Sequence, residues 1–588
     1  MKILLTAVNA KYIHSNLAIY SLKAYAEKYA DGADIFVMEF TINQQTDEIL
    51  RGIYREKPDM LCLSCYIWNW DHIVRIVREV KKVLPDVILW LGGPEVSYDG
   101  AAVLKSLPEA DGVMKGEGEQ TFAELAAYYQ GKQGKRLSDI PGIVYRAERA
   151  CGADKEIREN DWREVIDLSS VPFVYQDMEP FRHKIIYYES SRGCPFSCSY
   201  CLSSIDKCLR FRDLDLVKRE LQFFLDHNVE QVKFVDRTFN CRHAHAIAIW
   251  KYILEHDNGL TNFHFEISAD LLNEEELELM GRMRPGLIQL EIGVQSTNPD
   301  TIREIHRTMQ FSRLSENVRR IHSYGNIHQH VDLIAGLPYE DYESFGKSFD
   351  AVYDLAPEQL QLGFLKVLKG SEMEKQKEKY ELLHKSFPPY EALSTRWLPY
   401  QDMIRLKEIE EMVEVYYNSR QFCYTLKYLT PKFPGPFAFF ESLAGYYRKN
   451  GLDEMNHSRI LRYEILLRFV KEWNAGDTEQ YRQLLTLDYY LRENAASRPD
   501  FAGEDRMSKE ALRDFYDREA SERKYLYGYD AYDKRKLRKM THIEEFTYDV
   551  TGDMKEKRLR ILFDYKNRSP LDHQARIVSC KNTAGSIQ

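Results

Sequence analysis

Short apolar runs alternate with helical patterns over residues 1–135. Met60–Tyr66 is a continuous apolar run, typical of a strand buried in a parallel sheet, and Trp70–Leu84 after it has the spacing of a helix. This repeated strand–helix alternation predicts an α/β fold with a doubly wound parallel sheet. Ligands bind such sheets at the carboxyl ends of the strands, where the strand order reverses. The loops expected at that edge are Asn9–Ser15, Tyr66–Asn69, Gly92–Tyr98 and Gly116–Glu119.

A second strand–helix series occupies residues 181–375. Six strand–helix units in this length suit a partial (β/α)6 barrel, because a complete eight-stranded barrel takes about 250 residues. Residues 136–180 are polar and irregular, and we interpret them as a linker with a small hairpin around Gly142–Arg146. The expected barrel strands are Ile185–Glu189, Gln231–Val235, His264–Ile267, Leu287–Gly293, His330–Ile334 and Leu360–Val367.

The pattern changes again in residues 380–588. Lys385–Asn474 and Asp477–Arg492 are expected to be helical, and the end of the chain is strand-like. Residues 531–588 hold 13 basic and 8 acidic side chains, and five of the basic ones lie in Lys534–Lys539. These residues and the terminal strands could form a small basic β-module that binds phosphates, but a solvated helix face explains the charges as well. The terminal strands are expected at His542–Val550, Arg558–Tyr565 and Ala575–Val578.

The composition of the 588 residues is ordinary for a globular protein, with 44% hydrophobic and 29% charged residues, which excludes wholesale disorder. The net charge of −10 excludes nucleic-acid binding by bulk charge, although a local basic patch stays open. No window reaches the roughly 18 apolar residues of a membrane span, and the N-terminus has the pattern of a first strand and not of a secretory signal. We therefore expect a cytoplasmic protein whose ten cysteines bind metal or lie buried.

The strongest chemical signal is the segment YYESSRGCPFSCSYCLS, residues 187–203. Cys194, Cys198 and Cys201 have the spacing C-x3-C-x2-C and follow the first strand of the second series, so they are expected on a loop at the mouth of the barrel. Three thiolates on one loop can hold three irons of a cubic [4Fe–4S] cluster and leave the fourth iron open. A structural zinc site is the alternative, but neither Cys208 nor Cys241 completes the paired spacing that zinc usually shows.

With this motif the sequence resembles the radical S-adenosylmethionine (SAM) superfamily. The resemblance implies that the open iron chelates the amino and carboxylate groups of SAM, and that the reduced cluster cleaves SAM to methionine and a 5′-deoxyadenosyl radical. Tyr200 stands where the family has an aromatic residue near the adenine.

The resemblance extends over residues 181–370. Phe234–Val235–Asp236 stands where many members have Gly-Gly-Glu, and Glu291–Ser296 is similar to the E-x-G-x-Q-S strand of the family. Each polar residue of these strands could instead cap a helix or pair with an arginine. The residues that the resemblance implies for SAM are Tyr200, Asp236, Glu266, Glu291, Gln295 and Ser296.

The first sheet lacks the G-x-G-x-x-G of a dinucleotide site and the acidic cluster of a receiver domain. Together with the barrel it resembles the Rossmann-like cobalamin-binding domain that is fused to some radical SAM barrels. Glycines at its loops would let the backbone approach a bulky planar ligand, although tight strand–helix turns would need them too. The residues that the resemblance implies for cobalamin are Asn9, Tyr12, Ser64, Tyr66, Gly92, Gly93, Pro94, Glu95, Gly116, Glu117 and Gly118.

Two features of the first domain depart from known patterns. The Asp-x-His-x-x-Gly motif of many cobalamin domains is missing, and His14 stands in no such motif, so we expect no histidine on the lower face of the cobalt. A neighbour on that face could come from Tyr66–Asn69. Cys62 and Cys65 form a C-x2-C, but a strand points them to opposite faces, and we interpret them as core thiols.

Residues 380–588 resemble the uncharacterised C-terminal extension of some cobalamin-type radical SAM proteins, a resemblance that brings no established role. The extension could close the side of the open barrel. The aromatic segment Tyr424–Phe440 could line the substrate cavity, although such runs more often lie in a core.

The resemblances together imply a cobalamin-dependent radical SAM enzyme that methylates an unactivated carbon, with a flavodoxin or ferredoxin as electron donor. Three alternatives stay open. They are a cyclase or rearrangement enzyme with the same cofactors, an enzyme that modifies tRNA through the basic module, and a non-catalytic cobalamin-responsive binding protein. The substrate, a small molecule or tRNA, does not follow from the sequence, and no membrane is expected.

Replacing any one of Cys194, Cys198 and Cys201 by alanine is expected to abolish reductive SAM cleavage, because each thiolate would hold a different iron. The measurement is 5′-deoxyadenosine formed by the reduced, reconstituted protein. A variant that still forms deoxyadenosine would contradict the assignment of the motif.

Overall fold

The computed structural model describes residues 1–30, 32, 34–132, 134, 136–147, 156–205, 207–495, 497–504 and 507–580. Cys151 lies outside the described residues. The chain forms two compact units. The first consists of Met1–Ile327, Ile334–Asp341 and Gly363–Tyr400, and the second of His328–Leu333, Tyr342–Leu362 and Gln401–Gln588.

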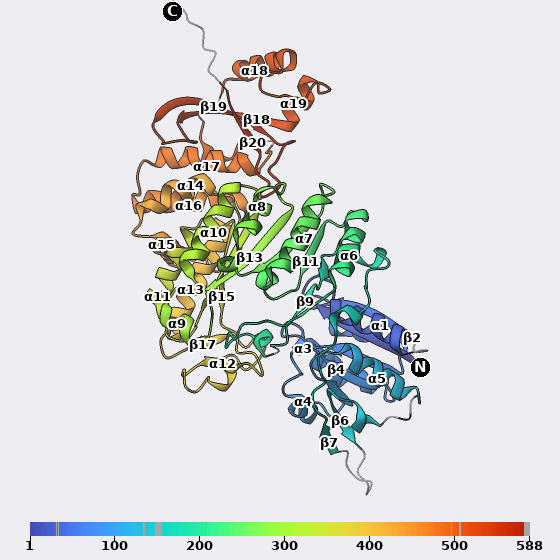
Figure 1. The fold of residues 1–588 in the computed structure, drawn as a ribbon. Coiled ribbons are helices and arrows are strands. Elements are labelled where there is room, and N and C mark those ends of the chain that lie inside the picture. The colour runs from blue at the N-terminus through green and yellow to red at the C-terminus, as the bar shows by residue number, and fades with distance from the viewer. Residues whose placement is uncertain are drawn as a thin grey trace, which may run out of the picture. The chain divides into compact units, whose positions relative to one another are not determined.

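The first unit begins with a seven-stranded sheet (Figure 1). Its strands are β1 (Lys2–Asn9), β2 (Asp34–Thr41), β3 (Met60–Ser64), β4 (Ile88–Gly92), β5 (Gly112–Met114), β6 (Ile143–Ala147) and β7 (Glu156–Glu159). The order is β2-β1-β3-β4-β5-β6-β7, and the pairs among β1 to β5 are parallel. The order reverses between β1 and β3, which confirms the doubly wound fold.

Five helices cover this sheet: α1 (Leu17–Tyr29), α2 (Thr46–Glu56), α3 (Trp70–Val83), α4 (Gly100–Ser106) and α5 (Glu119–Tyr129). Alternate residues of β1 enter different cores, because successive strand residues point to opposite faces. Ile3 and Leu5 pack in the core that includes α1 and α5, whereas Leu4 packs in the core that includes α2, α3 and α4. Cys62 lies in the first of these cores and Cys65 in the second, so both are core thiols, as expected.

Strands β6 and β7 come from the segment expected to be a linker with a hairpin. The hairpin forms, and β6 also pairs antiparallel with β5, so the segment extends the first sheet. This extension gives β5 a hydrogen-bonding neighbour on its outer edge.

A second parallel sheet in the first unit contains β8 (Ile186–Tyr188), β11 (Gln231–Phe234), β12 (Asn262–Ile267) and β13 (Ile288–Gln295) in the order β13-β12-β11-β8. Strands β14 (His328–Ala335) and β15 (Gln359–Phe364) also form, so all six expected barrel strands are present. The helices of this series are α6 (Leu214–Asp226), α7 (His243–Glu255), α8 (Glu274–Gly281), α9 (Pro299–Glu304), α10 (Phe311–Tyr324) and α11 (Tyr342–Tyr353).

Short elements complete the first unit. Two-residue strands β9 (Ser191–Arg192) and β10 (Arg210–Phe211) pair antiparallel just after β8. Further along the chain lie α12 (Glu372–Lys375), β16 (Leu383–His384) and β17 (Ala392–Ser394).

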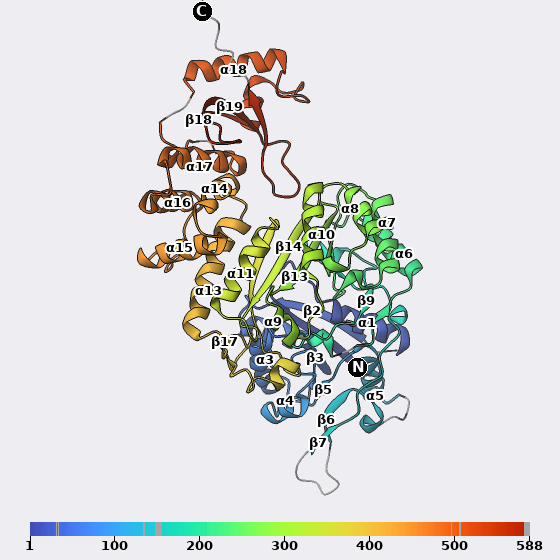
Figure 2. The ribbon, with the colours of Figure 1, turned by 60° about the vertical axis from the view of Figure 1, so that its left-hand side comes forward.

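The second unit contains most of the helical region expected from the sequence. The prediction is wrong for Lys385–Pro399, which holds the strand β17 and no helix, because Pro388, Pro389 and Pro399 disfavour helical backbone. The helices of this unit are α13 (Tyr400–Met412), α14 (Cys423–Leu429), α15 (Pro436–Lys449), α16 (Arg459–Trp473), α17 (Thr478–Arg492), α18 (Lys509–Glu522) and α19 (Lys534–Met540). Figure 2 shows α15, α16 and α17 in successive layers, followed by the antiparallel sheet of β18 (Thr541–Tyr548), β19 (Glu556–Asp564) and β20 (Arg576–Cys580). The aromatic segment Tyr424–Phe440 supplies core residues such as Phe439 and Phe440, which are fully buried.

The three terminal strands confirm the expected β-module, and the basic run Lys534–Lys539 forms the helix α19 beside it. Among the helices of the described residues, none is long and apolar enough to span a bilayer.

Candidate active site

The three cysteines of the C-x3-C-x2-C motif lie on the loop between β9 and β10. Cys194 and Cys198 are buried and Cys201 is half-buried. The loop is held by its own hydrogen bonds: the Cys201 backbone N–H donates to the Cys198 carbonyl at 3.1 Å, and Ser204 Oγ donates to the same carbonyl at 2.9 Å. Burial raises the pKa of the Cys194 thiol, so its proton must leave when the sulfur binds iron.

Among the described residues, no three His, Cys, Asp or Glu side chains converge as ligands of one metal ion would. A cubic cluster makes a different demand, because each cysteine binds a separate iron and the three sulfur atoms need not meet at one point. The donor set therefore fits a cubic cluster.

Asp236, at the end of β11, holds the start of the cysteine loop from the barrel side. Its carboxylate is fully buried and accepts hydrogen bonds from the backbone N–H of Ser190 at 2.9 Å, the backbone N–H of Ser191 at 2.5 Å and Ser190 Oγ at 2.6 Å. Burial raises the pKa of Asp236 to about 7. The three hydrogen bonds already engage both oxygens of Asp236 with the protein. Its contact with SAM stays a prediction.

Tyr200 and Cys198 share a partner that the sequence analysis did not identify. Arg307 Nη1 lies 3.3 Å from Tyr200 Oη and 3.8 Å from Cys198 Sγ, and Nη2 donates to the Gly293 carbonyl of β13. Burial raises the pKa of Tyr200, so its hydroxyl stays protonated. Arg307 follows α9 in a segment without a motif, which is why spacing alone could not find it.

Gln295 and Ser296, at the end of β13, differ in how they are engaged. Gln295 has a backbone φ of 73° and its buried Oε1 has no hydrogen-bond partner among the described residues. A buried acceptor of this kind is costly unless a donor reaches it, so it fits a ligand that carries one, such as the amino group of SAM. Ser296 donates instead to Glu340 at 2.6 Å.

Glu291 and Glu266 form ion pairs with barrel residues. The Glu291 carboxylate lies 3.0 Å from Lys233 Nζ and 3.1 Å from His264 Nε2. Burial would raise the pKa of Glu291, but His264 and Lys233 lower it to about 2. Glu266 lies 3.9 Å from Arg237. Glu266 realises the expected alternative of pairing with an arginine, whereas Glu291 pairs with a lysine and a histidine. For both residues the SAM contact stays a prediction.

A cavity of about 720 Å3 opens where the carboxyl ends of the first sheet face the start of the barrel. The loops after β1, β3, β4 and β5 all contribute to its wall, as the doubly wound fold requires. From the barrel side the wall includes Tyr187, Glu189, Arg192 and Gly193, so the cavity reaches the residue next to Cys194.

Most residues expected to bind cobalamin line this cavity. Those in the wall are Asn9, Ser64, Tyr66, Gly92, Gly93, Pro94, Gly116, Glu117 and Gly118. In the described wall Tyr12 and Glu95 do not occur: Tyr12 is 68% exposed with Lys184 over its ring, and Glu95 pairs with Lys369 at 3.1 Å. Their cobalamin contacts stay predictions.

Polar side chains shape the loops after β1 and β3. Asn16 caps α1 through the Ile19 N–H and donates to Ser64 Oγ at 3.2 Å. Asn69 is fully buried and donates to the Val8 and Ser64 carbonyls, tying the two strands on either side of the order reversal. Asn16 was not identified from the sequence, because asparagines at loop positions are common, and Asn69 was included only as the last residue of the expected loop Tyr66–Asn69.

The cavity wall also contains His14 and two aromatic residues of the segment expected near the lower face of cobalamin. His14 lines the cavity, and its Nδ1 lies 2.6 Å from Tyr187 Oη of β8. The expectation of no histidine on the lower face of the cobalt stays a prediction. Tyr66 and Trp68 also line the cavity and stack on each other at a centroid distance of 4.3 Å, within the segment expected to supply a neighbour for that face.

Gly93 is required by the fold itself. Its φ is 115°, and a Cβ there would lie 2.5 Å from the Cys65 carbonyl oxygen. The expected reason for this glycine was close approach to a ligand, whereas the structure adds close approach between two strand ends.

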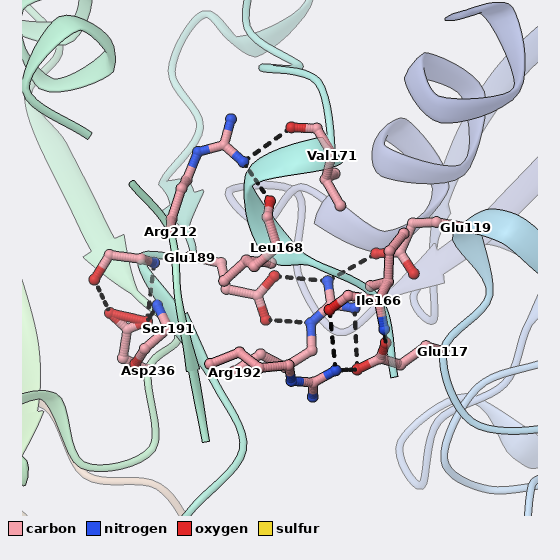
Figure 3. Close-up of polar contacts among 12 residues, drawn as sticks. Glu117, Glu119, Ile166, Leu168, Val171, Glu189, Ser191, Arg192, Arg212 and Asp236 are labelled. Carbon is pink, nitrogen blue, oxygen red and sulfur yellow. Dashed lines mark hydrogen bonds and ion pairs between the residues drawn. The ribbon is translucent and has the colours of Figure 1, made fainter. Parts of the chain in front are cut away.

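Glu117 and Glu119 contact arginines of the cysteine loop. Glu119 lies 2.7 Å from Arg192, and Glu117 lies 2.7 Å from Arg210. Figure 3 shows Arg192 between these carboxylates and Glu189. Burial would raise the pKa of Glu119, but Arg192 outweighs it and the pKa is lowered. The cavity wall and the cysteine loop are thus joined by ion pairs.

Comparison with protein families agrees with this architecture. Residues 3–126 match the B12 binding domain, residues 188–352 match the radical SAM superfamily, and residues 378–563 match a protein family of unknown function, DUF4080. The chain therefore combines a B12-binding domain, a radical SAM domain and a DUF4080 region.

Individual relatives have low sequence identity to this chain. The cobalamin-dependent radical SAM methyltransferase TokK of Streptomyces tokunonensis is 28% identical over 49% of this chain and 44% of its own length. The anaerobic magnesium-protoporphyrin IX monomethyl ester cyclase of Rubrivivax gelatinosus is 24% identical over 55% of this chain and 59% of its own. The chain thus spans about half the length of such relatives. The solved structure of the cobalamin-dependent SAM radical enzyme OxsB shares the fold, with a TM-score of 0.58, 15% identity, and coverage of 88% of this chain and 80% of that one.

Replacing Asp236 by alanine is expected to lower iron incorporation, because two buried backbone N–H groups at the start of the cysteine loop would lose their acceptor at about 1–3 kcal/mol each. Asp236→Asn retains an amide oxygen as acceptor and should lose less. The measurement is iron per chain after anaerobic reconstitution. Equal iron in the alanine variant and the native protein would contradict this role.

Proposed function

We propose that this protein is a cobalamin-dependent radical SAM enzyme that methylates an unactivated carbon. The observation that carries the proposal is the single cavity of about 720 Å3, whose wall combines the strand ends of the B12-binding domain with Arg192 and Gly193 of the cysteine loop. Two cofactors that react with one substrate must share such a space. Relatives named as methyltransferases, among them TokK and the hopanoid C-3 methylase of Methylococcus capsulatus, support the reaction class.

The residues present fit the three cofactors. Cys194, Cys198 and Cys201 would hold the [4Fe–4S] cluster, and Gln295, whose buried oxygen lacks a partner among the described residues, would accept a hydrogen bond from SAM. The cavity loops, with Gly92 and Gly116 in the wall, would hold cobalamin. When bound, the cluster and SAM supply a 5′-deoxyadenosyl radical for hydrogen abstraction, and cobalamin supplies the methyl group.

The chain itself contributes positioning and charge. Asp236 fixes Ser190 and Ser191 ahead of Cys194, and Arg307 connects Cys198 with the carbonyl of Gly293. Tyr187 and His14 form a hydrogen-bonded pair between the two domains at the cavity wall. These contacts would keep the reacting groups at fixed separations.

A cyclase or rearrangement with the same cofactors is the alternative, supported by the cyclase relatives. We further propose that the protein works in the cytoplasm with a flavodoxin or ferredoxin as electron donor. The nine described cysteines are all free thiols, which suits a reducing compartment.

Anaerobic reconstitution with iron, sulfide and hydroxocobalamin, followed by desalting, is expected to give four irons and one cobalt per chain. Four irons without cobalt would leave a radical SAM enzyme and contradict the methylation mechanism. Reduced holoprotein that never cleaves SAM would instead favour the non-catalytic binding protein. With a substrate found, a product heavier by one methyl unit separates methylation from cyclisation.

A second proposal concerns the basic helix α19. Lys534, Arg535, Arg538 and Lys539 line a surface depression of about 440 Å3 by themselves. Lys534 pairs with Asp517, and Arg538 lies over the ring of Tyr516. Four cations on one exposed face repel one another, so a polyanion such as tRNA would relieve the repulsion. This observation supports the tRNA-modifying alternative.

Replacing these four residues by glutamine is expected to weaken tRNA binding and to lower its salt dependence, because about four phosphate contacts are lost. The measurement is the binding constant against salt concentration. A matched control replaces Lys555 and Lys557, exposed cations of the same module that pair with Asp553 and Asp549. Equal binding by both variants and the native protein would remove the tRNA proposal.

A further inference from the structure

Two arginines stand directly opposite each other at the base of the cysteine loop. Arg192 of β9 and Arg210 of β10 are partners in the antiparallel pairing, so their side chains leave the hairpin on the same face. The loop that carries the three cysteines runs between these two positions. Like charges directly opposite on paired strands are destabilising, so the hairpin needs compensation from elsewhere.

The B12-binding domain supplies that compensation. Glu117 Oε1 lies 2.7 Å from Arg210 Nη1 and 3.5 Å from Arg192 Nη1, between the two cations. Glu119 Oε1 accepts from Arg192 Nη2 at 2.7 Å. Glu189, just after β8, accepts two hydrogen bonds from Arg192, one from Nε at 2.9 Å and one from Nη2 at 2.7 Å. We name these five residues the Arg192 network.

The Arg192 network is largely withdrawn from water. The exposed fraction is 20% for the Arg192 side chain and 7% for Glu119. Burial alone would lower the pKa of Arg192, and Glu119 and Glu189 raise it. The planar guanidinium reaches carboxylates on two sides at once, which the single ammonium of a lysine cannot reproduce.

The same segments also form the wall of the cavity. Gly116, Glu117, Gly118 and Glu119 line it from the B12-binding domain, and Arg192 and Gly193 line it from the barrel. A ligand that fills the cavity would contact both sides of the Arg192 network. Coupling between two binding sites is reciprocal. If a ligand in the cavity stabilises this network, an ordered cysteine loop in turn raises the affinity of the cavity for that ligand.

We propose that Arg192 is a positioning residue that couples occupancy of the cavity by a corrinoid to closure of the base of the cysteine loop. The inference rests on the proposed function, in that the cysteines hold iron and the cavity holds cobalamin. Glu117 and Glu119 belong to this device as the counter-charges that permit the Arg192–Arg210 pairing.

The test compares protein reconstituted with iron and sulfide alone and protein reconstituted with iron, sulfide and hydroxocobalamin. The measurement is the rate at which each loses iron to an excess of a ferrous chelator. In the native protein hydroxocobalamin is expected to slow iron loss at least about fivefold, the lower end of typical coupling between sites. Arg192→Lys keeps the charge and loses the two-sided contact. In this variant the slowing is expected to fall below about twofold.

Arg212→Lys is the matched control. Arg212 is a buried arginine two residues beyond Arg210, and it pairs with Glu220. It also donates to the carbonyls of Leu168 and Val171 (Figure 3). The hydrogen bonds and ion pairs described for its side chain include none to the Arg192 network, although the charge of Glu189 contributes to raising its pKa after Glu220. Its variant should keep the full effect of hydroxocobalamin.

A second pair of variants guards against misfolding near the cysteines. Glu119→Gln changes a residue 73 positions away from Arg192 and should also reduce the effect of hydroxocobalamin. Glu124→Gln, on the same helix and paired with Arg163, should leave it unchanged.

Three results would overturn the inference: native protein whose iron loss hydroxocobalamin does not slow, Arg192→Lys with the full effect, or Arg212→Lys with an equal loss of it. The proposed function fails in a different way, since the desalted native protein would then lack iron or cobalt before the chelator is added.

Discussion

Neutralisation of two opposed guanidinium groups is the interaction on which the candidate active site depends. Arg192 and Arg210 face each other across the hairpin that closes the cysteine loop, and carboxylates of the B12-binding domain lie between and beside them. Without those carboxylates the hairpin would place two cations side by side in a poorly solvated position. The cysteine loop is therefore completed by a domain that contains none of its cysteines.

A second contact holds the same segment from the other direction. The buried carboxylate of Asp236 binds Ser190 and Ser191, while the B12-binding domain binds Arg192. Three consecutive residues ahead of the cysteines are thus fixed by two domains. Geometry of this kind is what positioning of two cofactors around one substrate requires, because small displacements of reacting groups are costly.

The core of the C-terminal region contains many packed aromatic side chains. Its helices are rich in buried tyrosine and phenylalanine, and Phe439, Tyr463 and Phe469 are fully buried. The aromatic segment that could have lined a substrate cavity instead supplies the core of this unit. The charged residues of α19, among them Arg535 and Arg538, remain on the surface of this unit.

The sequence by itself determined most strands and helices and the position of the cysteine loop. Apolar alternation predicted the strands and helices of both sheets, and C-x3-C-x2-C predicted a metal-binding loop, because periodicity and spacing act over a few residues. Only the tertiary structure decided which polar side chains serve that loop. Arg192 meets Glu119 across 73 positions and Arg307 meets Cys198 across 109, and no local pattern encodes such pairs. It also decided that Glu117 meets the cysteine loop as well as lining the cavity, and that Asp236 binds backbone, since a carboxylate at a strand end acquires its role from whatever the fold brings beside it.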